Sequence, residues 1–151
     1  MDKNKSILSA AIVVLLPLLP ALIDVGYKLY LPIMEDVILH ILMTIIVFGV
    51  PEAVIIYYGY TTGDNITSTL SGVFLIPLYI FYSEILLELS DPDFIMAGLG
   101  HWLRIITIID LVIPALICGV MGYCASKRTR ASLLVSIFSG TFLILIFVLI
   151  N

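Results

Sequence analysis

Five apolar stretches of about twenty residues or more account for nearly the whole chain, with short polar segments between them. An α-helix needs about twenty mostly apolar residues to cross the hydrocarbon core of a bilayer. A helix also satisfies its own backbone polar groups, which lipid cannot do. The sequence therefore predicts an all-α bundle of about five transmembrane helices in a single domain, 1–151. The predicted helices run from about 6 to 30, 33 to 60, 66 to 89, 101 to 124 and 131 to 150.

The composition argues against a water-soluble fold. Hydrophobic residues make up 62% of the 151 residues and charged residues only 12%, whereas a soluble domain has roughly a quarter charged residues. A domain of this size has too much surface to hide so much apolar area from water. A net charge of −4 with seven basic residues gives no basic patch for nucleic acid. We therefore expect a multi-pass protein of the cell membrane, surrounded by the lipid bilayer and without a nucleic-acid partner.

The positions of the basic residues predict the orientation in the membrane. Lys3 and Lys5 precede the first apolar stretch, while Lys127, Arg128 and Arg130 follow the fourth. Loops rich in lysine and arginine tend to stay in the cytoplasm. Four predicted crossings separate the two basic clusters, so both clusters can lie on the cytoplasmic side. The sequence thus predicts a cytoplasmic N-terminus and an external C-terminus.

Acidic residues within the apolar stretches are the main functional signal. A carboxylate near the middle of a membrane costs roughly 2.5–3.5 kcal/mol on insertion scales unless it binds a proton, a cation or a basic side chain. Glu52 and Asp110 have no basic residue within one turn of their own helices, and Glu84 lies about a turn inside the end of its helix. We therefore interpret Glu52, Asp110 and Glu84 as candidate proton- or cation-binding residues.

Pro51, next to Glu52, predicts a break in the second helix. This segment would be about 42 Å long as one straight helix, longer than the hydrocarbon core of about 30 Å. A break at Gly49 and Pro51 would place Glu52 on the first turn of a half-helix, where free amides stabilise an anion. Proline also removes the donor to the Val47 carbonyl, which would become a neutral oxygen ligand. Transporters use such breaks as binding sites. The alternative is a simple proline kink, with Glu52 near the interface.

Asp24 and His40 are candidate supporting residues. Lys28 follows Asp24 by four residues, a spacing at which the two charged groups can meet on a helix. An ion pair at the membrane interface is the prediction for them. His40 follows Asp36 by one turn, so the carboxylate could orient the imidazole ring. The alternative is that His40 simply packs against neighbouring helices.

Arg104 is a third candidate supporting residue, near the start of the fourth predicted helix. It could reach Glu84 or Glu88 on a neighbouring helix. The alternative is an anchor at the membrane interface beside Trp102, a residue type that favours that depth.

Small residues at helical spacing allow two interpretations. They let helices approach closely, either in a dimer interface or within one bundle. Cys118 and Cys124 lie on different faces of the fourth helix, so we expect buried free thiols rather than a disulfide or a metal site. The small residues in question are Ser132, Ser136 and Gly140 in the last helix, and Ala115, Gly119 and Gly122 in the fourth.

The sequence carries no phosphate-binding loop, paired-histidine zinc motif or activated serine or cysteine. No cofactor is therefore expected, and an enzyme is not favoured. The first hypothesis is transport or handling of protons or cations by the intramembrane carboxylates. Five helices are few for a self-contained carrier, so we expect a homo-oligomer or other membrane subunits as partners. One alternative is a non-catalytic subunit or assembly factor of a larger membrane complex. A weaker alternative is a membrane-embedded, lipid-modifying enzyme.

Overall fold

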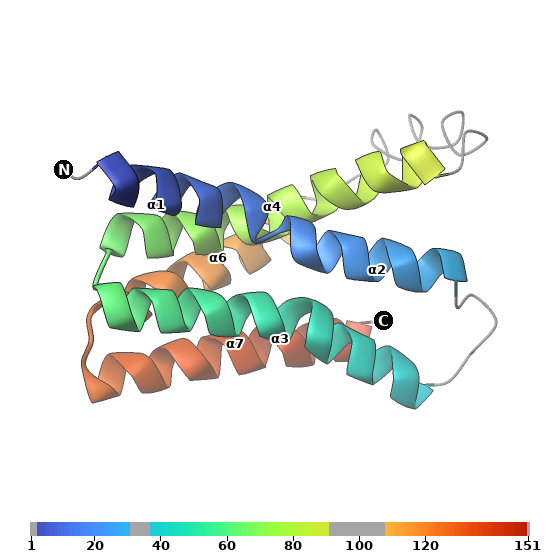
Figure 1. Ribbon diagram of the computed structural model, residues 1–151. Helices are drawn as coiled ribbons and strands as arrows, with labels where there is room; N and C mark the ends of the chain where they lie inside the picture. Colours follow the sequence, from blue (N-terminus) through green and yellow to red (C-terminus); the bar gives the residue numbers. More distant parts are fainter. Residues whose placement is uncertain (1–2, 31–36, 91–107, 151) are drawn as a thin grey trace.

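The protein is all-helical throughout the part of the chain that the computed structural model describes, residues 3–30, 37–90 and 108–150 (Figure 1). The all-α prediction is therefore confirmed. Within these ranges no strand occurs. The helices are α1 (Lys3–Leu15), α2 (Leu18–Tyr30), α3 (Val37–Thr62), α4 (Asn65–Ser90), α6 (Ile108–Ser126) and α7 (Arg130–Ile150).

Four helical stretches in the described residues are long and apolar enough to cross a membrane, fewer than the five that the sequence predicts. The apolar part of α6, Leu111–Ser126, is shorter than a full span. Residues 101–107, the expected beginning of that helix, lie outside the described residues. The four stretches are Ser9–Leu29, Ile38–Thr62, Asn65–Ser90 and Arg130–Leu149.

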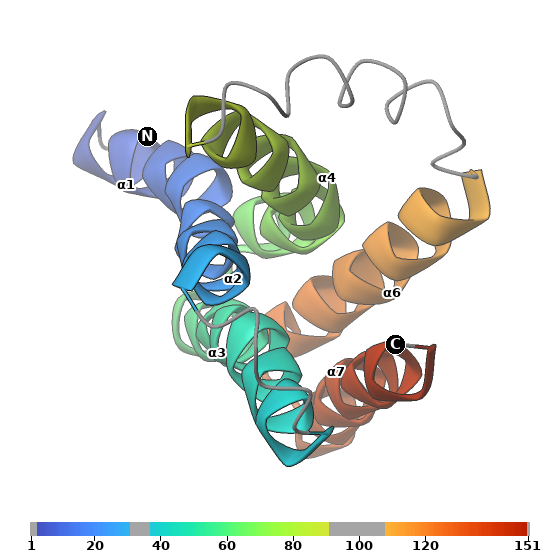
Figure 2. The same cartoon turned by 90° about the vertical axis from the view of Figure 1, so that its right-hand side faces the viewer.

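The helices run lengthwise beside one another, with the two ends of the chain at opposite ends of the bundle (Figure 1). Seen end-on, α1 and α2, α4, α6, α7 and α3 follow one another around the bundle (Figure 2). The turns between α3 and α4 and between α6 and α7 lie at the same end as the start of α1 (Figure 1). Lys3 and Lys5 therefore lie at the same end as Lys127, Arg128 and Arg130, the arrangement that the orientation argument requires.

Small residues bring α4 and α6 into backbone contact. A Cβ atom added to Gly72 would lie 2.0 Å from the Cys118 carbonyl oxygen, and one added to Gly122 would lie 2.1 Å from the Ser68 carbonyl oxygen. Only glycine fits such an approach, which is the usual way in which helices associate in lipid. The small residues of α6 therefore pack inside the bundle. Both cysteines carry free thiols, but the expected burial holds only for Cys118, which is fully buried, whereas Cys124 is partly exposed.

Two of the three small residues of α7, Ser136 and Gly140, face the interior, whereas Ser132 is partly exposed and its hydroxyl bonds with Thr129 at the start of the helix. Ser136 is fully buried, and its hydroxyl donates a hydrogen bond to the Met121 carbonyl of α6 at 2.7 Å. Gly140 is buried against Met121 and Glu52. Both α7 positions are thus used for packing within one chain, which favours the second of the two interpretations of this spacing.

The proline break lies in the first predicted helix rather than in the second. Residues Leu16 and Pro17 form a turn between α1 and α2, whereas α3 continues through Pro51. The predicted break at Pro51 is therefore wrong, and a continuous helix agrees with the alternative of a simple proline kink. Pro17 and Pro20 remove two donors from one face, and Leu19 N–H compensates by donating to the Leu16 carbonyl at 3.3 Å. Pro51 alone removes one donor, which a bend accommodates, and Figure 1 shows that the axis of α3 changes direction along its length.

A two-residue turn, Gly63 and Asp64, joins α3 to α4. Gly63 has a φ of 67°, a conformation that favours glycine, and its N–H donates to the Gly59 carbonyl at 2.9 Å. Asp64 caps α4, because its carboxylate accepts bonds from the Thr67 N–H at 3.0 Å and the Thr67 hydroxyl at 2.7 Å. Partial burial raises the pKa of Asp64, but hydrogen bonds from Thr67 and Tyr58 outweigh it and hold the pKa below its ordinary value of 3.8.

Arg128, in the turn between α6 and α7, caps the end of α3. Its Nε donates to the Tyr60 carbonyl at 3.0 Å, and its guanidinium also donates to the Thr61 carbonyl. Carbonyls in the last turn of a helix have no donor within that helix, and a cation suits the negative end of the helix dipole. This basic residue thus ties the α6–α7 turn to the end of α3.

Candidate functional site

Glu52 lies near the middle of α3 and points toward α6 and α7. Its side chain is only 3% exposed, and its Oε1 is buried without a hydrogen bond from any residue that the structure describes. A Cβ atom on Gly140 of α7 would lie 2.7 Å from Glu52 Oε2 and 3.1 Å from Met121 Sδ. The carboxyl group therefore occupies the space that the missing side chain of Gly140 leaves free.

A groove of about 420 Å³ runs between α3 and α7 beside Glu52. We call it the α3–α7 groove. Its walls are mostly apolar, and Glu52 is the one charged residue among the described residues that line it. The rim is open, since Tyr57 is 72% exposed and Ala53 and Thr141 are exposed as well. Ile56, Ile137 and Ile144 contribute to the walls.

Pro51 directly precedes Glu52 inside α3. It is fully buried within α3 and cannot donate to the Val47 carbonyl one turn earlier. Glu52 follows it in the same continuous helix, so no half-helix begins at this point. Helix-terminal amides consequently do not explain the position of the acid. The role of Val47 as an oxygen ligand stays a prediction.

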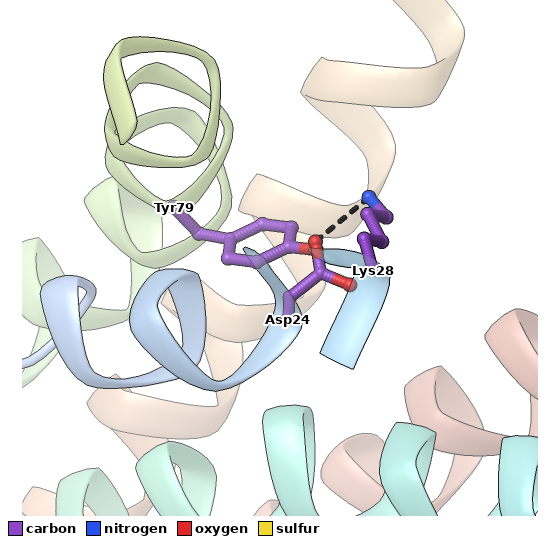
Figure 3. Close-up of polar contacts among 3 residues, drawn as sticks. All are labelled: Asp24, Lys28 and Tyr79. Atoms are coloured by element: carbon purple, nitrogen blue, oxygen red, sulfur yellow. Dashed lines mark hydrogen bonds and ion pairs between the residues drawn. The ribbon is translucent and has the colours of Figure 1, made fainter. Parts of the chain in front are cut away.

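A second polar cluster consists of Asp24, Lys28 and Tyr79 (Figure 3). The predicted ion pair is present, with Lys28 Nζ 2.8 Å from Asp24 Oδ2. The Tyr79 hydroxyl donates to the same Asp24 oxygen at 2.8 Å, which joins α2 to α4. The chain separates Asp24 from Tyr79 by 55 residues, so no local spacing predicts this contact.

His40 lies beside this second cluster. It lines a cavity of about 280 Å³ together with Asp24, Lys28 and Tyr79. Its Nε2 is buried and has no hydrogen-bond partner within the described residues, and its backbone carbonyl accepts a bond from the Thr44 hydroxyl at 3.0 Å. His40 therefore belongs to the cavity of the second cluster rather than to the α3–α7 groove. The predicted pairing with Asp36 falls outside the described residues.

The structure does not bring Glu84 to Glu52. Glu52 lies ten residues before the end of α3, whereas Glu84 lies nineteen residues after the start of α4, and a short turn joins those two helix ends. At about 1.5 Å per residue, the two positions differ by roughly 13 Å along the bundle. Oε2 of Glu84 is buried and has no hydrogen-bond partner among the described residues. No group of three or more potential metal ligands occurs within those residues.

The structure does not describe the side chains of the two remaining predicted residues, Asp110 and Arg104. Asp110 lies near the start of α6, but its side chain is outside the described part of the chain, and so is all of Arg104. In the end-on view, α4 and α6 diverge toward the end of the bundle where α6 begins (Figure 2). A contact between Glu84 and either Asp110 or Arg104 therefore stays a prediction.

Comparisons with protein families, curated proteins and solved structures find no match to the chain. What the site can bind therefore follows from its own chemistry. Glu52 offers one carboxyl group with an unpaired oxygen, set in apolar walls and reached through an open rim.

Proposed function

We propose that the chain is a multi-pass membrane protein that transports or handles protons or cations through Glu52. The observation that carries this proposal is the buried carboxyl group of Glu52, whose Oε1 has no partner in the described structure. An isolated carboxylate is costly in an apolar environment unless a proton or a cation neutralises it. The α3–α7 groove extends from Glu52 past Tyr57 and Tyr60 toward the end of the bundle at Arg128, which gives either one a route from the membrane interface.

The proposal includes five crossings of the cell membrane, with α6 as the additional crossing, a cytoplasmic N-terminus and an external C-terminus. Its support is the position of the two basic clusters at one end of the bundle and of the two termini at opposite ends. Basic residues favour the cytoplasmic side. Cysteine accessibility in intact cells would test it, with labelling expected near residue 151 from outside and near residue 128 only after permeabilisation.

Flux measurements in sealed liposomes test the function. The purified chain should dissipate an imposed proton or monovalent-cation gradient, and Glu52→Gln should abolish this flux while leaving the protein folded. Glu88→Gln is the matched control, since it makes the same chemical change near the end of α4, and its flux should equal that of the parent. Equal flux from the parent and Glu52→Gln would overturn the proposal, as would a parent without any flux.

The α3–α7 groove also supports the alternative of a non-catalytic subunit or assembly factor. Its exposed rim and single acid would suit a partner helix that carries a lysine or arginine, from another subunit or a second copy of the chain. Glu52→Gln would then release a co-purifying partner without changing any flux. That result would replace the transport proposal.

A further inference from the structure

We propose that the α3–α7 groove binds an amphiphilic organic cation, with a protonated amine or quaternary ammonium head at Glu52 and an apolar body along the groove. This inference rests on the proposed function, because it names the substrate class of the same carboxyl group. It follows from three features of the groove, which are its volume, its supply of oxygen ligands and the tyrosines at its rim.

The volume suits an organic molecule. The groove measures about 420 Å³, and pockets for small organic ligands span about 300–1,000 Å³. A proton or an inorganic ion that bound to Glu52 would fill only a small part of this volume. An organic body fills it and buries its own apolar surface against the side chains of Ile56, Ile137 and Ile144.

The oxygen ligands do not suit a divalent metal ion. Calcium takes six to eight oxygen ligands and magnesium about six in an octahedral arrangement. The groove offers one carboxyl group, and the Thr141 hydroxyl near it already donates to the Ile137 carbonyl at 2.9 Å. A single charge-bearing group matches a single positive charge that needs no coordination shell, such as an ammonium head.

The rim fits a cation that arrives from the membrane interface. Tyr57 and Tyr60 line the groove one and two turns beyond Glu52, and both are exposed. Tyrosine rings attract organic cations through their electron-rich faces. The tyrosines lie on the stretch of α3 that leads toward the end of the bundle where Arg128 sits. An amphiphilic cation can therefore pass from that end along tyrosine rings to the acid.

Equilibrium binding of radiolabelled tetraphenylphosphonium to the full chain in lipid nanodiscs tests the inference. We expect saturable binding that dodecyltrimethylammonium competes away, whereas tetraphenylborate, an anion of the same shape, does not compete. Glu52→Gln should weaken binding at least tenfold. Ala53→Trp should weaken it similarly, because the ring fills the groove while the acid is kept. Val54→Trp is the matched control, since Val54 is exposed on α3 and does not line the groove, and its affinity should equal that of the parent.

The outcomes separate this inference from the proposed function. Absence of saturable binding by the parent overturns the inference, and a flux that still requires Glu52 would show that the proposed function survives with a proton or a small ion alone. Binding that Glu52→Gln leaves unchanged, or that Ala53→Trp and Val54→Trp weaken equally, also overturns it. Circular dichroism and size-exclusion profiles identify any variant that fails to fold, and Ala53→Trp and Glu52→Gln provide two independent routes to the same result.

Discussion

Gly72→Ala should strongly destabilise the bundle, although it adds only one methyl group. The new Cβ atom would lie 2.0 Å from the carbonyl oxygen and 2.5 Å from the carbonyl carbon of Cys118, and 2.9 Å from the backbone nitrogen of Gly119. All three neighbours are backbone atoms, so no side chain can rotate away. Ordinary contact begins at 3.4 Å, so α4 and α6 would have to separate by roughly 1.4 Å in this region.

The magnitude follows from that displacement. Overpacking in a close-packed interior costs about 1–3 kcal/mol and occasionally more. A gap of about 0.5–1 Å already forfeits a quarter to a half of the dispersion energy of the contacts that it opens. Because α4 and α6 meet through backbone atoms at both Gly72 and Gly122, the loss extends along the interface. We expect the free energy of unfolding to fall by about 3 kcal/mol, the upper part of that range.

Gly26→Ala is the matched control. It is the same substitution inside α2, where an added Cβ atom would have no other described atom within 4 Å. Alanine is more favourable than glycine inside a helix by about 0.5–1 kcal/mol, so this variant should be slightly more stable than the parent. Unfolding in mixed micelles with increasing dodecyl sulfate, followed by circular dichroism, measures both. A Gly72→Ala protein as stable as the parent, or two variants that shift in the same direction, would refute the close contact between α4 and α6.

Three further predictions concern individual hydrogen bonds. Asp64→Ala should cost about 1 kcal/mol through loss of the helix cap, whereas Asp64→Asn should keep most of it. Because the folded-state pKa of Asp64 is lowered, the contribution of its carboxylate to the free energy of unfolding is complete above the ordinary pKa of 3.8 and is lost as the pH falls below that value. Acid-unfolding curves of the Asn variant should not show this loss. Ser136→Ala should lower the free energy of unfolding by about 0.6 kcal/mol, because its hydroxyl joins α7 to α6. Ser139→Ala should cost nothing measurable, because among the described residues its hydroxyl bonds within α7. Equal losses of stability in the two variants would contradict this. Tyr79→Phe and Asp24→Asn should show a coupling of about 1 kcal/mol in a double-mutant cycle, and additive effects would exclude the bond between α2 and α4.

The helices were predictable where local chemistry defines them. The apolar run predicted for residues 66–89 corresponds to α4 at Asn65–Ser90, because the turn residues Gly63 and Asp64 end one helix and cap the next. The run predicted for 131–150 likewise corresponds to α7. In such segments length, periodicity and turn chemistry indicate the same boundaries, so little tertiary information is needed.

The proline break was not predictable from the presence of proline alone. Pro17 and Pro20 lie three residues apart and remove two donors from one face, and the helix breaks there. Pro51 removes one donor, and α3 continues. The length of the second segment suggested a break, but a long helix can also tilt or protrude from the bilayer. The spacing between prolines was therefore the more informative signal.

The surroundings of the acids depend on tertiary packing. Glu52 contacts Gly140, which lies 88 positions later in the sequence, and Asp24 contacts Tyr79, which lies 55 positions later. Nothing in local spacing identifies such partners. The separation of Glu52 from Glu84, by contrast, could have been predicted by counting residues from the turn between α3 and α4, since each residue adds about 1.5 Å.

Reaction with dicyclohexylcarbodiimide most directly tests whether Glu52 is an unpaired carboxyl group in a groove open to lipid. This apolar reagent enters membranes and adds to protonated carboxyl groups, and peptide mass spectrometry identifies the modified residue. In sealed liposomes we expect Glu52 to be modified, with a rate that tetraphenylphosphonium lowers. A Glu52 that stays unmodified while Glu88 reacts would contradict the proposed site. Modification of Glu52 at a rate that the organic cation does not change would contradict only the binding of an organic cation there.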